Sequence, residues 1–357
     1  MSEPRFSVVV PLYNHARFVG AAIESVLGQS FGDFELIVCN DGSTDDSLEV
    51  VRRYQDPRMR LIDKPNGGTV SALNACLLAA KGTYVCWLSS DDLFSPDKLL
   101  VHQRHHAAHP ASSLSIAPFG YLKGTEWIPA AQLRVPSDFR LVQFAYGNYV
   151  NGLSVCASRR MYAQYGLFDQ RYLYAHDVER WFAFFRHEVP VFLDGPAQSH
   201  TRLESGHIAD GDLLGQLDVL KFLCRVVQGQ GLRGFLPAEA ATAPGPAPLL
   251  AALLARLLDA NTLFHRFHMR RYLIEWLAQG PGAEDRRRDL PAAIELCARQ
   301  PGMQDEILRA LGELNGLLQQ SDPLPTPSFA EHMAQLKAGV ESPDHRRVLQ
   351  RFLRVGF

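Results

Sequence analysis

The sequence predicts an α/β fold: a mostly parallel sheet with helices on both faces, followed by an α-helical C-terminal region. Two observations lead to this prediction. Between residues 6 and 88, short segments that are apolar without alternation recur, and segments with apolar residues at helical spacing separate them. Strands that are apolar along their whole length are buried on both faces, and strands that alternate with helices form parallel sheets. From about residue 208 onward the pattern is helical.

Four segments predict the strands of this sheet, because they are short and rich in β-branched and aromatic residues. They span residues 6–10, 34–39, 59–62 and 84–88, and we expect Pro11 to end the first. Helices are predicted between them, over residues 16–27, 47–54 and 69–80. Asp45, Asp46 or Ser47 is expected to cap the second of these helices.

Further elements are predicted beyond Asp92. Pro96 is expected near the first turn of another helix, because proline is favoured there. Residues 177–186 predict a helix with an aromatic face, and residues 191–193 predict a short strand. Residues 114–150 are mixed in composition and are expected to be rich in loops. The alternation of strands and helices predicts a Rossmann-like arrangement.

A chain of 357 residues is too long for one ordinary hydrophobic core. We therefore expect a first domain over residues 1–207, which contains the sheet, and a helical C-terminal region over residues 208–357. A segment rich in Gly, Pro and Ala at residues 229–248 predicts a break within this second region.

The composition restricts the class of protein. The net charge is −2, which argues against a general nucleic-acid binder because no positive field gathers phosphates. The six cysteines are scattered without a CxxC motif, which is typical of reduced thiols in the cytosol. We find no signal peptide and no apolar run of about 18 residues, so a cytoplasmic location is expected.

Two adjacent aspartates follow the fourth predicted strand, in the sequence YVCWLSSDDL. Ligands of open parallel sheets bind beyond the carboxyl ends of the strands, and Asp41, Asp91 and Asp92 all follow strand ends. Neighbouring carboxylates repel each other, so a divalent cation is expected between them. Oxygen ligands suit Mg²⁺ or Mn²⁺. The alternative is a solvated loop or a helix cap, which is the commoner role of an Asp-Asp pair.

The exit of the first strand lacks both GxGxxG and GxxxxGK[ST], which disfavours a dinucleotide dehydrogenase and a P-loop enzyme. Instead, the blocks PLYN, NDGSTDDS, NGGTVSALN and SSDDLFSPDKL, in this order, resemble the nucleotide-binding half of a family 2 glycosyltransferase over roughly residues 5–207. The resemblance implies the glycosyltransferase A fold, a nucleotide-sugar donor, a divalent metal (Mn²⁺ or Mg²⁺) and inversion at the anomeric carbon.

The resemblance also implies roles for individual residues. Pro11, Tyr13 and Asn14 would line the nucleoside pocket, and Asp41 would bind the base. Asp91 would contact the ribose, and Asp92 would bind the metal. A carboxylate only accepts hydrogen bonds, so Asp41 suits uracil, thymine or guanine and disfavours cytosine. A UDP-sugar is the first hypothesis, with dTDP- and GDP-sugars as alternatives.

The acceptor side resembles the family over residues 148–182, where an acidic residue precedes an aromatic helix. Asp177 matches the catalytic base, and its alternative role is an N-cap. The family usually has Glu where His176 stands. It also often has an acidic residue at the position of Ser89 and Arg near Leu73. In the segment SHTRLESGH, His200 is the tentative further metal ligand, with a plain surface loop as the alternative.

Two other sets of residues are given structural roles. Histidines 102, 105, 106 and 109 are expected on a helix that faces water, without a metal, because no Cys or carboxylate joins them in the sequence. Residues 265–276 and 345–357 predict amphipathic helices that pack within the protein. The alternative for these helices is peripheral contact with the inner face of an anionic membrane.

The expected activity is transfer of a sugar from a nucleotide-diphosphate donor to a hydroxyl of a glycan or lipid-linked acceptor, in surface polysaccharide synthesis. One alternative is a binding module of the same fold that has lost catalysis. The other is a nucleotidyltransferase, which the absence of glycine in PLYNHARF disfavours.

Overall fold

The computed structural model describes residues 3–129 and 150–203, together with residues 222, 245–248, 250–251 and 283–299. The chain forms two compact units. The first comprises Met1–Ser137 and Asn148–Asp212, and the second comprises Asp138–Gly147 and Leu213–Phe357. Most of the Gly/Pro/Ala-rich segment at 229–248 lies outside the described residues.

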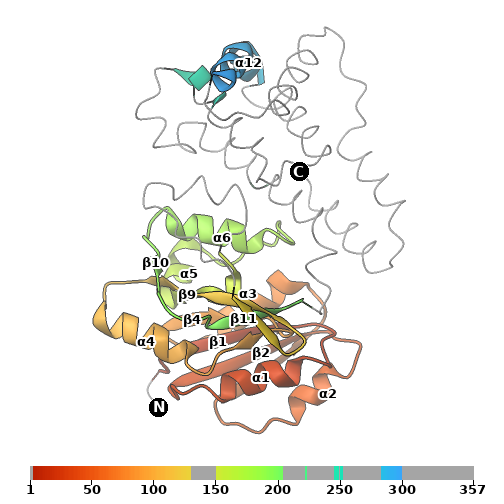
Figure 1. The fold of residues 1–357 in the computed structure, drawn as a ribbon. Coiled ribbons are helices and arrows are strands. Elements are labelled where there is room, and N and C mark those ends of the chain that lie inside the picture. Colours follow the sequence, from red (N-terminus) through yellow and green to blue (C-terminus); the bar gives the residue numbers. More distant parts are fainter. Residues whose placement is uncertain are drawn as a thin grey trace. The chain divides into compact units, whose positions relative to one another are not determined.

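The first unit is built on a seven-stranded sheet with the order β10-β6-β9-β4-β1-β2-β3 (Figure 1). Neighbouring strands are parallel except on either side of β9, which runs antiparallel to both β4 and β6. The predicted mostly parallel α/β sheet is thus confirmed. The strands are β1 (Phe6–Leu12), β2 (Phe34–Asp41), β3 (Met59–Lys64), β4 (Tyr84–Trp87), β6 (Leu114–Ile116), β9 (Val155–Ser158) and β10 (Val191–Phe192).

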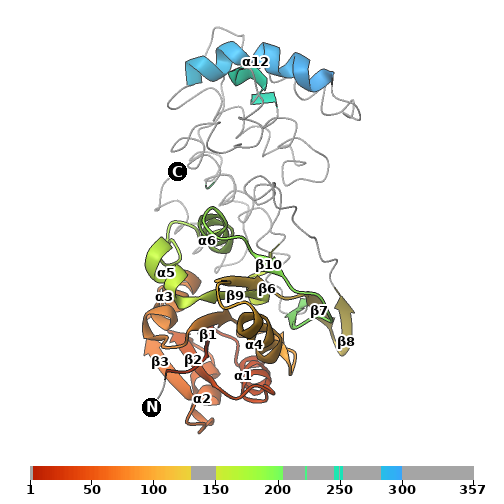
Figure 2. The same cartoon turned by 90° about the vertical axis from the view of Figure 1, so that its left-hand side faces the viewer.

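Helices cover both faces of this sheet (Figures 1 and 2). Side chains alternate along a strand, and the even-numbered residues of β1, such as Val8 and Val10, form one core with Ile23 and Val26 of α1. On the other face, α3 lies against β1 and β2, and Cys76 of α3 contacts the Ile37 carbonyl. The helices of the first unit are α1 (Val19–Leu27), α2 (Ser47–Arg52), α3 (Thr69–Ala79), α4 (Lys98–Ala108), α5 (Arg159–Tyr165) and α6 (His176–Phe185).

A second, four-stranded sheet lies at the exit of β4, with the order β5-β11-β7-β8. Its strands are β5 (Leu93–Phe94), β7 (Phe119–Lys123), β8 (Glu126–Pro129) and β11 (Ser199–Arg202). Because β5 follows Asp92 directly and pairs with β11, this small sheet brings residues 199–202 beside the acidic pair. The sequence analysis did not predict β5–β9 or β11.

The first two strands are longer than predicted. Pro11 lies inside β1, which continues to Leu12. In a parallel strand, the N–H and C=O of one residue point to the same side. The Val9 carbonyl accepts from Leu88 on the β4 side, so the nitrogen of Pro11 also faces that side, where β4 has already ended. Its missing N–H therefore breaks no pairing. Likewise, β2 continues to Asp41, so that carboxylate is held by a strand.

In the second unit the structure describes the helix α12 (Ala283–Ala298), which contains Pro291. The two segments considered for membrane contact, 265–276 and 345–357, lie outside the described residues. No helix within the described part of the chain is long and apolar enough to cross a membrane.

Candidate active site

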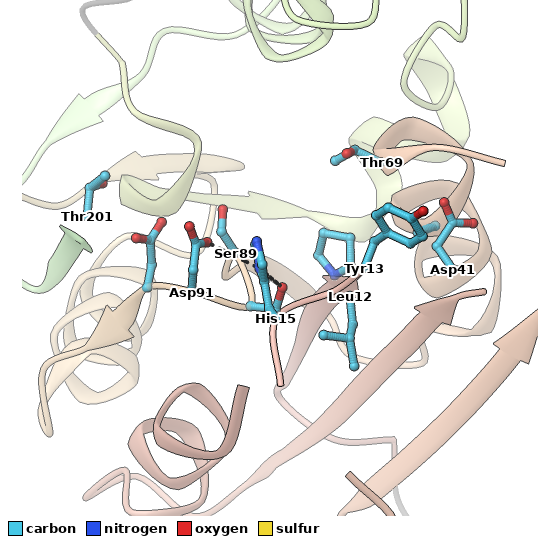
Figure 3. A pocket seen from close by; sticks show the side chains of 12 residues that line it. Leu12, Tyr13, His15, Asp41, Thr69, Ser89, Asp91 and Thr201 are labelled. Atoms are coloured by element: carbon cyan, nitrogen blue, oxygen red, sulfur yellow. Dashed lines mark hydrogen bonds and ion pairs between the residues drawn. The ribbon is translucent and has the colours of Figure 1, made fainter. Parts of the chain in front are cut away.

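A cavity of about 280 Å³ opens at the carboxyl ends of β1, β2 and β4. It is elongated: Asp41 and Tyr13 lie at one end, and Asp91 and Thr201 lie at the other (Figure 3). The residues that line it come from the exits of these strands, the start of α3 and β11. They are Pro11, Leu12, Tyr13, His15, Asp41, Thr69, Ala72, Ser89, Ser90, Asp91, Asp92 and Thr201. The three strand ends therefore converge on one cavity, as the sequence predicted.

Asp41 is held at its end of the cavity by three donors. Its Oδ1 accepts from the Gly67 N–H at 2.8 Å and from the Lys64 ammonium, and its Oδ2 accepts from the Gly68 N–H at 2.6 Å. A carboxylate has about four lone-pair positions, so one acceptor position remains on Oδ2. Only 1% of Asp41 is exposed, so these bonds fix its orientation. The sequence did not single out Lys64 or the two glycines.

The loop after β1 is fastened to the loop after β2. Asn14 has a φ of 54°, in the left-handed region that asparagine tolerates. Its backbone N–H donates to Ser43 Oγ at 3.0 Å, and its side-chain oxygen accepts from the Thr44 N–H at 2.7 Å. The structure therefore places Asn14 beside the cavity wall, where its bonds join two loops, and its contact with a nucleoside stays a prediction.

His15 lines the cavity between its two ends, and the sequence analysis missed it. Its Nδ1 lies 2.7 Å from Ser90 Oγ and 3.9 Å from Asp91 Oδ1 (Figure 3). Its backbone N–H donates to Ser47 Oγ, at the start of α2. The ring is thus oriented beside the acidic pair. The one sequence feature that could have indicated a cavity position for His15 is that it directly follows the PLYN block.

The acidic pair occupies the other end of the cavity, and both residues are buried. Asp92 Oδ1 accepts from the Arg202 N–H at 2.8 Å, and Arg202 Nε donates to the Asp91 carbonyl at 3.1 Å. Burial, with the neighbouring charge of Asp91, raises the pKa of Asp92 well above its usual range. Its ionised form is therefore costly unless a cation offsets it.

His200 lies on β11 next to Thr201. Adjacent strand residues point to opposite faces, and Thr201 is the one that lines the cavity. His200 Nε2 is 2.8 Å from Ser95 Oγ, and the Trp127 ring packs on the imidazole with centroids 3.9 Å apart. Among the described residues, His200 forms no group of three potential ligands with Asp91 and Asp92 within 4.8 Å. The geometry thus gives the tentative metal role of His200 no support.

Asp177 lies in the first turn of α6, is 6% exposed, and is not among the residues that line the cavity. Ala175 occupies the N-cap position, so Asp177 does not cap the helix, contrary to the alternative raised from the sequence. The preceding residue, His176, packs against Trp87 at the end of β4, with ring centroids 5.6 Å apart. The start of α6 therefore covers the strand that leads into the acidic pair.

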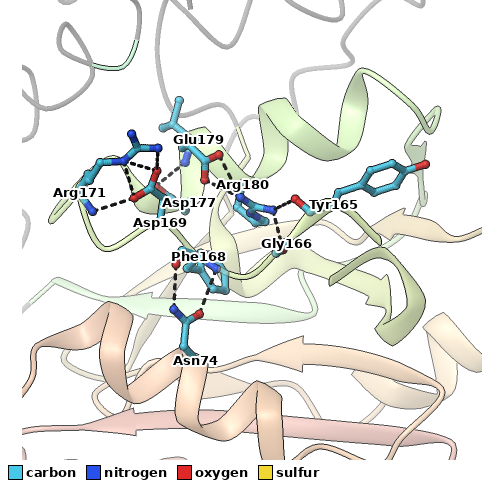
Figure 4. A network of polar contacts seen from close by, with 10 residues as sticks. Asn74, Tyr165, Gly166, Phe168, Asp169, Arg171, Asp177, Glu179 and Arg180 are labelled. Carbon is cyan, nitrogen blue, oxygen red and sulfur yellow. Dashed lines mark hydrogen bonds and ion pairs between the residues drawn. The ribbon is translucent and has the colours of Figure 1, made fainter. Parts of the chain in front are cut away.

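A polar network holds α6 in place (Figure 4). Arg180 Nη1 donates to the carbonyls of Tyr165 and Gly166 at 2.6 Å each, and its Nη2 pairs with Glu179. Asn74 of α3 exchanges two hydrogen bonds with the backbone of Phe168. These bonds tie the segment before α6 to the helix whose start lines the cavity.

The helix α4 differs from its prediction, because His102 and His106 are buried rather than exposed to water. Cys156 of β9 joins them, and their potential ligand atoms lie within 4.8 Å of one another. Hydrogen bonds already account for both rings. His106 Nδ1 is 3.2 Å from the Ser112 carbonyl, and Ser115 Oγ lies 2.8 Å from His102 Nδ1 and 2.9 Å from His106 Nε2. Lys98, fully buried, sits 3.4 Å from the remaining nitrogen of His102. We interpret the cluster as a hydrogen-bonded core.

The sequence profile of glycosyl transferase family 2 matches residues 7–178. The chain carries a family 2 glycosyltransferase domain. The match begins in β1 and ends just after Asp177, so it includes the cavity residues of β1, β2, α3 and the β4 exit.

Two curated relatives are similar to parts of this chain. An uncharacterized glycosyltransferase of Rickettsia prowazekii is 32% identical over an alignment of 196 residues, which covers 52% of this chain and 59% of that protein. The chondroitin synthase of Pasteurella multocida is 45% identical over 96 residues, which are 26% of this chain and 10% of that protein. The chain thus spans less than two thirds of the length of either relative.

The fold of this chain also matches solved structures. A crystal structure of residues 1–349 of S. aureus TarS, in complex with UDP-GlcNAc, has a TM-score of 0.59 at 17% identity and covers 87% of this chain and 90% of that chain. Another S. aureus TarS structure has a TM-score of 0.58, also at 17% identity, over 87% of this chain and 55% of that chain. At this identity the likeness is one of fold, and it agrees with the glycosyltransferase A fold that the resemblance implied.

Proposed function

We propose that this protein transfers a sugar, with inversion and with a divalent metal, from a nucleotide-diphosphate donor to a hydroxyl of a glycan or lipid-linked acceptor. The observation that carries the proposal is the elongated cavity, with Asp41 fixed at one end and Asp91 and Asp92 buried at the other. A nucleoside diphosphate has the same polarity along its length, with a hydrogen-bonding base at one end and a charged diphosphate at the other.

Asp41 selects the base in this proposal. Its one remaining acceptor position on Oδ2 suits a ring N–H, which uracil presents at its pairing edge. Thymine and guanine present one too, so dTDP- and GDP-sugars are the alternatives to a UDP-sugar. Cytosine presents a bare nitrogen instead, which would be repelled. Tyr13, partly exposed beside Asp41, offers an aromatic surface for the base.

The acidic pair fits Mg²⁺ or Mn²⁺. Both are hard cations that prefer oxygen ligands, and the buried Asp92 carboxylate beside Asp91 is costly to ionise without a cation. Asp92 would hold the metal, which when bound would stabilise negative charge on the diphosphate. Asp91 would contact the ribose. His15 and Arg202 bring further potential positive charge to this end of the cavity.

Asp177 would act as the base. Its carboxylate would take the proton of the acceptor hydroxyl while that oxygen attacks the anomeric carbon from the face opposite the diphosphate. The bond from the anomeric carbon to the diphosphate oxygen breaks, and the diphosphate leaves with the electron pair. A single displacement of this kind inverts the anomeric carbon. The burial of Asp177 and its aromatic neighbours on α6 provide a partly dry environment for the transfer.

The comparisons support the class of substrate. The TarS structure is bound to UDP-GlcNAc, which favours a UDP-sugar as the donor. The chondroitin synthase and the hyaluronan synthase of P. multocida, each 45% identical to this chain over 96 residues, carry names of enzymes that build polysaccharides. We therefore propose a role in the synthesis of a surface polysaccharide. The cytoplasmic location, at the inner face of the membrane, stays a prediction from the sequence.

The test is a thermal-shift titration with UDP, GDP and CDP in Mn²⁺, Mg²⁺ or EDTA. A ligand that binds only the folded state raises the melting temperature by mass action. We expect a metal-dependent shift with UDP, a smaller one with CDP, and loss of the metal dependence in Asp92→Ala. A stronger shift with CDP would contradict the role of Asp41. No shift with any nucleotide would favour a binding module that has lost donor recognition.

Asp177→Asn separates binding from chemistry. The amide keeps the shape of the side chain but cannot take a proton, so UDP should bind as in the wild type. Transfer from a UDP-sugar should fall by about 10²–10⁴-fold, the usual contribution of a general base. Transfer at an undiminished rate would assign the base to another residue.

A further inference from the structure

Four buried polar atoms without a hydrogen-bond partner gather where α6 meets β4. Seven side chains in the described residues have such an atom, and these four are Trp87 Nε1, His176 Nε2, Arg180 Nε and Trp181 Nε1. Native proteins leave few buried polar groups unpaired, and each one needs an explanation. Their concentration next to Asp177, outside the cavity assigned to the donor, is such a case.

The aromatic rings of this cluster contact one another. The Phe168 ring lies 5.9 Å from that of Trp87, 5.8 Å from that of His176 and 5.9 Å from that of Trp181, measured between centroids. The His176 and Trp87 rings also contact each other, with centroids 5.6 Å apart and ring planes tilted by 44°. The two residues that carry these unpaired nitrogens therefore pack against each other at the end of β4.

Two of the four atoms have simple structural explanations. The Arg180 guanidinium already makes bonds to two carbonyls and to Glu179 through its other nitrogens. Trp181 is 1% exposed and packs between Phe168 and Phe184 as part of the core. Trp87 differs because it is partly exposed, and it stands two residues before Ser89, which lines the cavity. Trp87 Nε1 and His176 Nε2 therefore remain the two buried nitrogens without such an explanation.

The hydrogen-bonding character of these two atoms is complementary. His176 Nδ1 is 3.1 Å from the Leu173 carbonyl, and a carbonyl only accepts, so Nδ1 carries the proton. In the neutral ring, Nε2 is then a bare acceptor. Trp87 Nε1 is only a donor. A hydroxyl group both donates and accepts, so one hydroxyl can satisfy both atoms, whereas a carboxylate or an ammonium group can satisfy only one.

We infer that His176 Nε2 and Trp87 Nε1 bind one hydroxyl of the acceptor, separate from the hydroxyl that Asp177 deprotonates. This inference rests on the proposed function and deepens it. The acceptor then carries at least two hydroxyls near the reaction centre, as a sugar ring does and a simple alcohol does not. The histidine in place of the family's usual Glu has a physical reason here: it accepts a hydrogen bond without a second negative charge beside Asp177.

Two substitutions at position 176 separate binding from structure. In His176→Asn, the amide nitrogen takes the place of Nδ1 and keeps the bond to Leu173, but the Nε2 position is lost. In His176→Gln, the side-chain oxygen reaches the Nε2 position, but the bond to Leu173 is lost. An acceptor-binding role predicts that Gln functions and Asn does not. A purely structural role predicts the reverse.

The experiment uses the full chain labelled with ¹⁵N at tryptophan and saturated with UDP and Mn²⁺ or Mg²⁺. The four indole N–H signals are assigned by single Trp→Phe substitutions. Methyl glycosides of glucose, galactose, N-acetylglucosamine and N-acetylgalactosamine are then titrated in turn. We expect at least one glycoside to move the Trp87 signal in wild type and His176→Gln. In His176→Asn, its dissociation constant should rise at least tenfold while UDP binds unchanged.

Either of two results would overturn the inference while leaving the proposed function standing. One is UDP binding with no response of Trp87 to any of the four glycosides. The other is a response of His176→Asn equal to that of the wild type. A failure of UDP itself to bind would instead remove the proposed function, and the inference with it.

Discussion

At the scale of single residues, the two adjacent aspartates have different surroundings. The Asp91 carboxylate lies near the His15 ring, and its backbone carbonyl accepts a hydrogen bond from the Arg202 side chain. The Asp92 carboxylate instead accepts a hydrogen bond from the Arg202 backbone N–H. Burial and the neighbouring Asp91 raise the pKa of Asp92. Because the folded state then holds a proton that the unfolded state has released, stability falls as the pH rises through the interval between the ordinary and the raised pKa.

Asp92→Asn should therefore stabilise the metal-free protein at pH 7.5. The amide keeps an oxygen for the Arg202 N–H and removes the costly charge. We expect the melting temperature in EDTA to rise by about 2–4 °C, which corresponds to about 1 kcal/mol for a domain of this size. The gain should shrink as the pH is lowered toward 4, where the wild-type carboxyl is protonated.

The control is Asp33→Asn, which changes an exposed aspartate and should leave the melting temperature unchanged. An Asp92→Asn protein that melts below the wild type in EDTA at pH 7.5 would show that the carboxylate is stabilising, and the argument for its cost would be wrong.

Sequence and structure agree best where a residue type has one dominant use. Asp41, Asp91 and Asp92 stand at or just beyond the carboxyl ends of mostly apolar strands, so their convergence could be predicted from strand ends alone. The partners of Asp41 could not be predicted in this way, because two of them are the backbone N–H groups of Gly67 and Gly68. Every residue except proline has a backbone N–H, so the sequence does not show which of these groups will bind a given carboxylate.

At the scale of elements, strand length separates what could be predicted from what could not. The strands β1, β2 and β3 have six to eight residues and were predicted, although Pro11 made β1 seem shorter. By contrast, β5 has two residues and β6 three, too few for an apolar pattern to stand out. Their pairing depends on distant segments, such as β11 for β5. Most of the short strands were therefore missed, including β11, which carries Thr201 and Arg202. The two-residue β10 is an exception, because residues 191–193 were predicted as a strand.

The hydrogen bonds between the loop after β1 and the loop after β2 give a prediction at the scale of elements. Asn14→Gly loses the bonds to Thr44 but tolerates the left-handed backbone, whereas Asn14→Ala loses the bonds and also strains the backbone. We expect Ala to be less stable than Gly by about 1 kcal/mol, seen as a lower melting temperature. Both variants should bind UDP more weakly, because Tyr13 and Asp41 lose their common support. Equal melting temperatures for Ala and Gly would contradict the backbone argument.

The contact between Trp87 and the short 3₁₀ turn Gly152–Ser154 gives a second prediction at the scale of elements. A Cβ at position 152 would lie 2.3 Å from Trp87 Cζ3, so Gly152→Ala must displace the indole. The expected cost is about 1–3 kcal/mol of stability, typical of overpacking. The Trp87 indole signal should shift without any ligand. Gly32→Ala is the matched control, because nothing lies within 4 Å of its added Cβ. An unshifted Trp87 signal in Gly152→Ala would contradict this packing.

At the scale of the whole molecule, buried histidines set how the protein responds to acid. Burial lowers the pKa of His102, His106 and His200. The charge of Lys98 adds to the effect on His102 and His200, and that of His105 adds to the effect on His106. Together these effects bring the pKa of His106 and of His200 to about 4. In the unfolded chain a histidine titrates near 6.5. Between these values the unfolded state binds more protons, so these three rings make stability fall as the pH drops from about 6.5 toward 4.

The slope of the unfolding free energy against pH measures this proton uptake. Near pH 5.5, His102, His106 and His200 should together contribute up to about three protons, which the raised pKa of Asp92 partly offsets. His106→Gln removes one titrating ring while its amide can still meet Ser115. Its slope should therefore be lower by close to one proton, whatever the substitution costs at pH 7. A slope equal to that of the wild type would mean that His106 is already protonated in the folded protein. In that case the histidine cluster on α4 would carry a positive charge, and our interpretation of it as a neutral hydrogen-bonded core would be wrong.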